Sequence, residues 1–199
     1  MKVLIGCEFS SVVREAFRKK GFNAWSCDII DSEDNSQYHL KEDVRKIIYD
    51  DWDLGLFFPP CTHLCVSGAR WFKQKTVEQE TALDFISRLM LAPIKHIAIE
   101  NPIGIISTKI RKPDQIIQPY QFGHGETKAT CLWLKNLPLL KPTNIVNGRE
   151  PRVHKGMGYG WNTLECKRER SRTYIGIAEA MADQWGKLIM TKENNGDSK

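Results

Sequence analysis

A cysteine follows two prolines at the end of a short apolar run, in the segment Leu54-Gly-Leu-Phe-Phe-Pro-Pro-Cys61. The apolar residues predict a strand that is buried on both faces of a parallel sheet. Because proline cannot continue a hydrogen-bonded ladder, the strand should end at Pro59, and the loop after it should be stiff. Cys61 would then lie just past the carboxyl end of a central strand, where open α/β sheets bind ligands. That position suits a nucleophile.

A second apolar run, His96-Ile-Ala-Ile-Glu100, predicts another buried strand, and it is followed by Asn101 and Pro102. We expect the ends of these two strands to lie side by side, so that a thiol and a carboxyl group share one pocket. Cys61, His63 and Cys65 match no common zinc spacing, and we therefore expect no metal site.

The first part of the chain has the pattern of a βαβ unit. A strand at 2–6 precedes a helix that Ser10 or Ser11 can cap, and a second strand at 22–27 ends at Asp28. A strand, a turn, a helix and a strand followed by an acid are typical of cofactor-binding units. The sequence therefore predicts an α/β fold, a Rossmann-like and mostly parallel sheet with helices on both faces.

The remaining elements follow from periodicity and capping signals. They are a short helix at 42–48, a helix that opens with a capping box at Thr76 and runs to 93, strands at 116–117 and 130–134, and a final helix at 176–189. We expect a single domain at 1–190, in which 135–170 is a loop-rich insert, and a disordered tail at 191–199.

Composition limits the class of protein. The chain has 199 residues, 41% of them hydrophobic, and a net charge of +5, which permits an anionic partner such as nucleic acid or a nucleotide. Its six cysteines are scattered, as expected for reduced thiols in a cytoplasmic protein. None of its apolar runs approaches the length that spans a membrane, so we expect no membrane partner.

The Pro59-Pro60-Cys61 loop and the Glu100-Asn101 strand end resemble motifs of the DNA cytosine carbon-5 methyltransferases, in the same order. Asp28, Asp43 and Phe9-Ser10 match further motifs of that family. The resemblance covers Met1 to Leu134 and, more loosely, the final helix. It is closest to the short phage and bacterial members, which lack a large target recognition domain. It implies the methyltransferase version of the fold and methyl transfer to carbon 5 of cytosine in DNA.

The resemblance also implies roles for individual residues. Cys61 would add to carbon 6 of the ring, and Glu100, with a raised pKa, would bond to ring nitrogen 3. Lys128 occupies a position where the family has an arginine. Its ammonium group supplies a positive charge but cannot form the two parallel hydrogen bonds of a guanidinium group. Cations that could activate the thiol are His63 and Arg70. Further substrate contacts are expected from Asn101, Arg170 and Arg172.

The implied cofactor is S-adenosylmethionine. The residues expected to bind it are Phe9, Ser10, Asp28, Ile29, Asp43, Val44 and Pro60. The family has a glycine-rich turn where this chain has Phe9-Ser-Ser-Val-Val13, and glycines there let the backbone approach a ligand closely. We expect Gly6 to compensate in part.

Three alternatives stay open. The missing recognition domain favours the same covalent chemistry on single-stranded DNA or a cytosine nucleotide. The altered turn favours transfer of another one-carbon group. A protein of another class, a catalytically silent and methyltransferase-like nucleic-acid-binding protein, is the third alternative. Trp71 lies close enough to the central loop to stack on a base, and the basic cluster 167–172 could contact phosphates.

Overall fold

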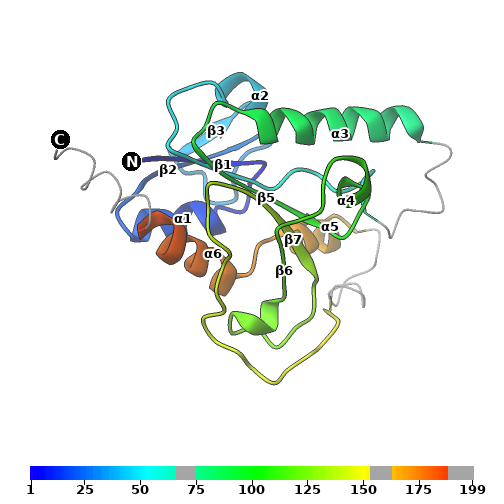
Figure 1. The fold of residues 1–199 in the computed structure, drawn as a ribbon. Helices are drawn as coiled ribbons and strands as arrows, with labels where there is room; N and C mark the ends of the chain where they lie inside the picture. Colours follow the sequence, from blue (N-terminus) through cyan, green and yellow to red (C-terminus); the bar gives the residue numbers. More distant parts are fainter. Residues whose placement is uncertain (66–74, 153–162, 188–199) are drawn as a thin grey trace.

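The computed structural model describes residues 1–65, 75–152 and 163–187. Its strands form one seven-stranded sheet in the order β3-β2-β1-β4-β5-β7-β6 (Figure 1). The strands are β1 (Lys2–Gly6), β2 (Asn23–Asp28), β3 (His39–Lys41), β4 (Leu54–Phe57), β5 (His96–Pro102), β6 (Gln115–Ile117) and β7 (Thr130–Lys135). The helices are α1 (Val12–Lys19), α2 (Val44–Ile47), α3 (Thr76–Leu91), α4 (Ile106–Lys109), α5 (Leu164–Ser171) and α6 (Ile175–Met181).

The sheet is mostly parallel, which confirms the predicted fold class. Strands β3, β2, β1, β4 and β5 pair in parallel, whereas β7 runs antiparallel to both β5 and β6. In the register of the central strands Gly6 lies opposite Phe57, and Phe57 lies opposite Ile99. The carboxyl ends of β1, β4 and β5 therefore meet at one edge of the sheet. The strand order reverses between β1 and β4, which is where doubly wound sheets bind their ligands.

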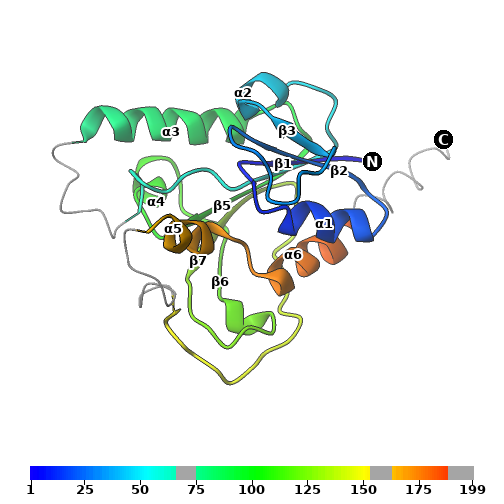
Figure 2. The same cartoon turned by 180° about the vertical axis from the view of Figure 1, so that it is seen from behind.

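Helices cover both faces of the sheet. On one face α1 and α6 lie side by side (Figures 1 and 2) and pack on alternate residues of β1, Val3 and Ile5. On the other face α2, α3 and α4 pack against a second cluster that includes Leu4 and Trp133. Because both faces are covered, Leu54–Phe57 is buried along its whole length, as its apolar run predicted.

Three local predictions are wrong. Neither Ser10 nor Ser11 caps α1; the Glu8 carboxylate accepts hydrogen bonds from the first-turn amides instead. Helix α3 begins without a side-chain cap, so the capping box at Thr76 does not form. Strand β5 was expected to stop before its proline, but it continues through Pro102. On the side that faces β4, the neighbouring strand has already ended, so the N–H that proline lacks would have had no partner there.

The segment expected to be loop-rich contains a helix. Helix α5 is capped by the Thr163 hydroxyl, which accepts from the Cys166 amide at 3.1 Å. Cys166 is buried, whereas its neighbours along the helix are exposed or half-buried, so the helix has no apolar stripe to reveal it. The final helix is α6, continued by a π-helical turn at Ala182–Gly186, and the predicted tail lies outside the described residues. No described helix combines the length and the apolar character needed to cross a membrane.

Candidate active site

The loop that carries the predicted nucleophile is attached to the neighbouring strand. The Asn101 side chain donates from Nδ2 to the carbonyl oxygen of Pro59 at 2.8 Å, and Asn101 is 1% exposed. This bond confirms that the ends of β4 and β5 lie side by side. Its Nδ2 is engaged by the loop backbone, and its Oδ1 is buried without a hydrogen-bond partner among the described residues, so the predicted contact of Asn101 with a substrate stays a prediction.

Cys61 begins a single helical turn. Its carbonyl oxygen accepts from the amides of Leu64 at 3.0 Å and Cys65 at 3.1 Å, and its thiol is half-buried. A hydrogen bond with the Cys65 thiol raises the pKa of Cys61, and burial and the charge of Glu100 raise it further. The Lys128 ammonium opposes these effects. Cys61 is therefore a thiol that needs a change in its surroundings before it becomes a thiolate.

Glu100 lies within electrostatic reach of the same thiol. Burial raises the pKa of Glu100, while the Lys128 ammonium and a hydrogen bond with the Thr130 hydroxyl lower it. The direction that the sequence predicted is thus confirmed. A neutral Glu100 can donate a hydrogen bond, and it also removes the negative charge that disfavours the Cys61 thiolate.

Lys128 comes to this pocket from the loop before β7. Its Nζ donates to the carbonyl oxygen of Arg170 at 2.7 Å, and its backbone amide donates to Gln118 Oε1 at 2.9 Å. The ammonium also lies 5.8 Å from the centre of the Tyr174 ring. These contacts agree with the position of α5 beside β7 in Figures 1 and 2. The structure thus brings together the three predicted catalytic residues, Cys61, Glu100 and Lys128.

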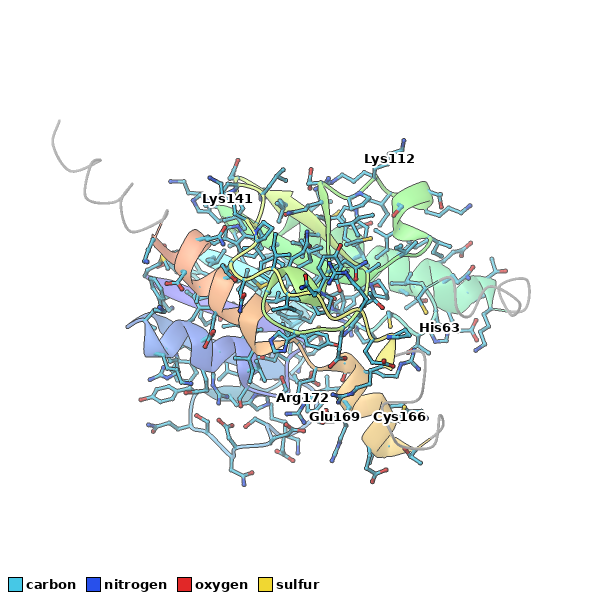
Figure 3. The ribbon with its side chains drawn as sticks, turned by 90° about the horizontal axis from the view of Figure 1, so that it is seen from below. His63, Lys112, Lys141, Cys166, Glu169 and Arg172 are labelled. Atoms are coloured by element: carbon cyan, nitrogen blue, oxygen red, sulfur yellow. The ribbon has the colours of Figure 1, made fainter. Side chains whose placement is uncertain are left out.

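The two arginines predicted to contact substrate have other surroundings. Arg172 forms a two-pronged ion pair with Glu33, with N–O distances of 2.7 and 2.9 Å, and contacts Glu169 at 3.2 Å (Figure 3). Its guanidinium group is therefore paired with carboxylates, and its predicted contact with a substrate stays a prediction. Arg170 offers its backbone carbonyl to Lys128, and its side chain is half-buried.

The cations proposed to activate Cys61 give a mixed result. His63 is not one of the groups whose charge shifts the pKa of the thiol, and its Nδ1 is buried without a hydrogen-bond partner among the described residues. Lys128 supplies the positive charge instead. Arg70 and Trp71 lie outside the described residues.

The two acids predicted to bind a cofactor, Asp28 and Asp43, lie near Cys7. Burial raises the pKa of the Cys7 thiol most, and the charges of both acids raise it further. Asp28 ends β2, and burial raises the pKa of its carboxyl group. Beside it, Ile29 is 72% exposed. Asp43 caps α2 and also pairs with Arg45, so its oxygens are largely engaged. The Asp28 carboxyl group is partly buried and accepts from the Ile30 amide at 3.3 Å, and its predicted contact with a cofactor stays a prediction.

The turn after β1 keeps a left-handed backbone without glycine. Ser11, at the first position where the family has glycine, has φ 63° and ψ −6°, and Cys7 has φ 59°. Gly6 does not compensate as predicted, because a Cβ there would lie 2.6 Å from the Phe57 ring and 2.8 Å from Val44, so Gly6 makes room for core side chains. Ser10 is 7% exposed, and its hydroxyl faces Glu8 at 3.4 Å rather than a ligand.

The other predicted cofactor residues differ in exposure. Phe9 is half-buried, and Pro60 is exposed on the nucleophile loop. Val44 is 4% exposed and lies close to Gly6 in the core, and its expected contact with a cofactor stays a prediction.

Sequence reasoning missed a buried polar network under this pocket. Glu8 accepts from the amides of Val13 at 2.6 Å and Arg14 at 3.2 Å, and burial raises its pKa to about 7. Arg14 is fully buried and bonds to Ser26 Oγ at 2.9 Å and to Asp34. The sequence signal that could have revealed this network is Arg14, which lies on the apolar face of α1. Among the described residues, no three His, Cys, Asp or Glu side chains are grouped as a metal site requires.

No family model matches the chain, and no curated protein matches it. Solved structures with a similar fold include two proteins described as methyltransferases. One is a protein from an E. coli prophage assigned as a DNA modification methyltransferase, with 13% identity over 79% of this chain and a TM-score of 0.46. The other is the Dnmt2 methyltransferase of S. pombe, with 14% identity over 83% of this chain and a TM-score of 0.47. This chain covers 54% and 57% of those two proteins, so it spans little more than half of their length.

Proposed function

We propose that this protein transfers a methyl group from S-adenosylmethionine to carbon 5 of cytosine, with Cys61 as the nucleophile. The observation that supports this proposal is the grouping of Cys61, Glu100 and Lys128, which come from three separate segments of the chain. The polar groups that the reaction needs, a thiol, a carboxylic acid and a cation, are all present at the carboxyl edge of the sheet.

Cys61 supplies the electrons that activate the ring. Carbon 5 of cytosine is a weak nucleophile, and a bond from Cys61 Sγ to carbon 6 moves the electrons of the ring double bond to carbon 5. The bound cofactor supplies the methyl group that carbon 5 takes up. Loss of the carbon 5 proton and cleavage of the Cys61–carbon 6 bond then restore the aromatic ring and release the thiolate.

Glu100 and Lys128 stabilise charge during this addition. The raised pKa of Glu100 keeps a proton available for ring nitrogen 3, toward which electron density moves when sulfur adds. Lys128 lowers the pKa of Cys61 and can face the base carbonyl with its ammonium. Asn101 holds the loop in place through Pro59, so it acts as a positioning residue.

The cofactor would bind at the ends of β1 and β2. Asp28 offers a carboxylate to ribose hydroxyls, and Ile29 and Phe9 offer apolar surface to adenine. The turn at Ser11 has the left-handed backbone conformation that glycine adopts most readily. Pro60 is exposed on the nucleophile loop, where it could contact the cofactor.

DNA is the substrate that we propose, with the target base flipped out of the helix to reach Cys61. A cytosine nucleotide or single-stranded DNA is the second candidate. The described residues 138–152 contain no strand or helix longer than three residues that could read a duplex, and this favours a substrate in which the base is already accessible.

A trapping experiment tests the proposal. Oligonucleotides that contain 5-fluorocytosine, in duplex and single-stranded form, and the corresponding nucleotide are incubated with the protein and S-adenosylmethionine. We expect a covalent adduct that carries the methyl group, because fluorine at carbon 5 blocks the final elimination. Cys61→Ser should abolish the adduct, Glu100→Gln should slow its formation, and Cys166→Ala, which changes a thiol on α5, should leave it intact.

The result also separates the rival functions. An adduct that survives Cys61→Ser refutes the assigned nucleophile. If radiolabelled S-adenosylmethionine modifies none of the three substrates and calorimetry detects no cofactor binding, the enzyme proposal is wrong. Nucleic-acid binding without labelling would then identify a silent, methyltransferase-like binding protein.

A further inference from the structure

The carboxyl-terminal end of α5, residues 170–172, contacts both halves of the proposed active site. At one end of it, the carbonyl oxygen of Arg170 accepts from Lys128 Nζ at 2.7 Å. Two residues later, the Arg172 guanidinium holds Glu33 with both prongs, at 2.7 and 2.9 Å. A displacement of this segment would therefore change both contacts.

The Glu33 end of this connection is firmly anchored to the proposed cofactor pocket. The backbone amide of Glu33 donates to the carbonyl oxygen of Phe9 at 3.0 Å. The next residue, Asp34, pairs with the fully buried Arg14 and accepts from the Ser32 hydroxyl at 2.9 Å. Glu33 is thus held on the turn that forms one wall of the pocket.

At the α5 end, the described residues provide little apolar packing. Cys166 is the buried residue of the helix, and the residues around it are exposed or half-buried, so apolar packing holds α5 weakly. Arg172 closes the helix, because its amide donates to the carbonyls of Arg168 at 3.2 Å and Glu169 at 3.3 Å (Figure 3). The guanidinium of Arg172 also contacts Glu169 of α5 at 3.2 Å, and its pair with Glu33 holds the helix end against the body of the protein.

We propose that the Arg172–Glu33 ion pair positions Lys128, so that cofactor binding beside Phe9 strengthens cytosine binding at Cys61. A ligand that orders the Phe9 turn also holds Glu33, and through Arg172 it holds the carbonyl that orients the Lys128 ammonium. Thermodynamic linkage requires the effect to be reciprocal, so cytosine must strengthen cofactor binding by the same factor. Arg172 touches neither ligand and is a positioning residue. This inference rests on the proposed function.

Calorimetry can measure the coupling without turnover. The dissociation constant of S-adenosylhomocysteine, which carries no methyl group to transfer, is measured with and without a saturating cytosine oligonucleotide. The ratio of the two constants is the coupling factor. For the unaltered chain we expect a factor of about five or more, the lower end of ordinary allosteric coupling. Arg172→Gln and Glu33→Gln should each bring it close to one.

Two further variants show whether the ion pair itself is responsible. The double variant Arg172→Gln with Glu33→Gln should match either single variant, because the second change has no interaction left to remove. Arg168→Gln removes the same charge from an exposed position on α5 and should keep the full coupling factor. Thermal unfolding of each variant checks that it is folded, and a change in stability alone would not alter the ratio of the two constants.

Each outcome decides between the inference and the function on which it rests. A coupling factor of one in the unaltered chain, or an unchanged factor in folded Arg172→Gln, refutes the inference and leaves the proposed function standing. If the unaltered chain binds neither S-adenosylhomocysteine nor cytosine, both are refuted.

Discussion

The buried carboxyl group of Glu8 should make the protein less stable as the pH rises through neutrality. Burial raises the pKa of Glu8 from its ordinary 4.5 to about 7, although the amides of Val13 and Arg14 oppose the shift. A carboxyl group with a raised pKa contributes stability that is complete below the pKa of the unfolded chain and is lost as the pH rises through the folded value. At about 1.4 kcal/mol per pKa unit, the loss amounts to about 3 kcal/mol.

Glu8→Gln isolates this contribution. The variant keeps a neutral side chain of similar shape, so the difference in unfolding free energy between it and the unaltered chain should depend on pH through Glu8. We expect urea unfolding to show the unaltered chain losing about 3 kcal/mol relative to the variant between pH 4.5 and 8. Ser10→Ala removes a hydroxyl whose hydrogen bond lowers the pKa of Glu8, so it should move the midpoint of this loss to higher pH.

The opposite slope, or a difference between the two proteins that does not change with pH, would refute the reasoning. Either result would mean that Glu8 is ionised in the folded chain throughout this range, held by the helix amides and by Arg14 more strongly than burial disfavours it.

Three further substitutions test local features. Asn101→Ala leaves the buried carbonyl oxygen of Pro59 without a donor, so urea unfolding should show a loss of about 1–3 kcal/mol in unfolding free energy. Adduct formation should slow, with no change in cofactor affinity. A stability equal to that of the unaltered chain would contradict this. Cys65→Ala removes the hydrogen bond that raises the pKa of Cys61, so iodoacetamide should alkylate Cys61 faster at pH 8, and a slower reaction would refute the assignment. Ser11→Val places a branched side chain in a left-handed conformation and should cost about 1–2 kcal/mol in thermal unfolding, whereas Ser11→Gly should cost less; equal losses would exclude strain at this turn.

The sequence predicted what local patterns encode. Apolar runs that end in proline located the two central strands, and because parallel neighbours share an edge, the same runs placed Cys61 near Glu100. Lys128 followed from motif order in the family resemblance. The strand ends could be predicted because the burial of a strand and the effect of proline depend on only a few consecutive residues.

The features that the sequence did not predict depend on partners far along the chain. Arg172 is 139 residues from Glu33, and Asn101 is 42 residues from Pro59, so neither bond leaves a local signal. The sequence did not predict helix α5, because an exposed helix with one buried residue has no periodic apolar pattern. The sequence did not predict the role of Glu8, because serines occupy the usual capping positions. The left-handed backbone at Ser11 directs the first-turn amides of α1 toward the Glu8 carboxylate, and no sequence pattern encodes this.

The place of β7 in the sheet has a consequence for synthesis on the ribosome. Strand β7 follows β6 along the chain but lies between β5 and β6, so β6 has no partner until Thr130–Lys135 has been made. Until then β5 is an open edge, and the backbone around Glu100 is free to pair with another nascent chain. The five parallel strands can pair from the first 102 residues alone, whereas the half that holds Lys128 must wait. The Lys128 side of the candidate site therefore assembles after the strands that carry Cys61 and Glu100. Substitutions that slow the insertion of β7 should reduce the yield of soluble protein more than they reduce the stability of molecules that have already folded.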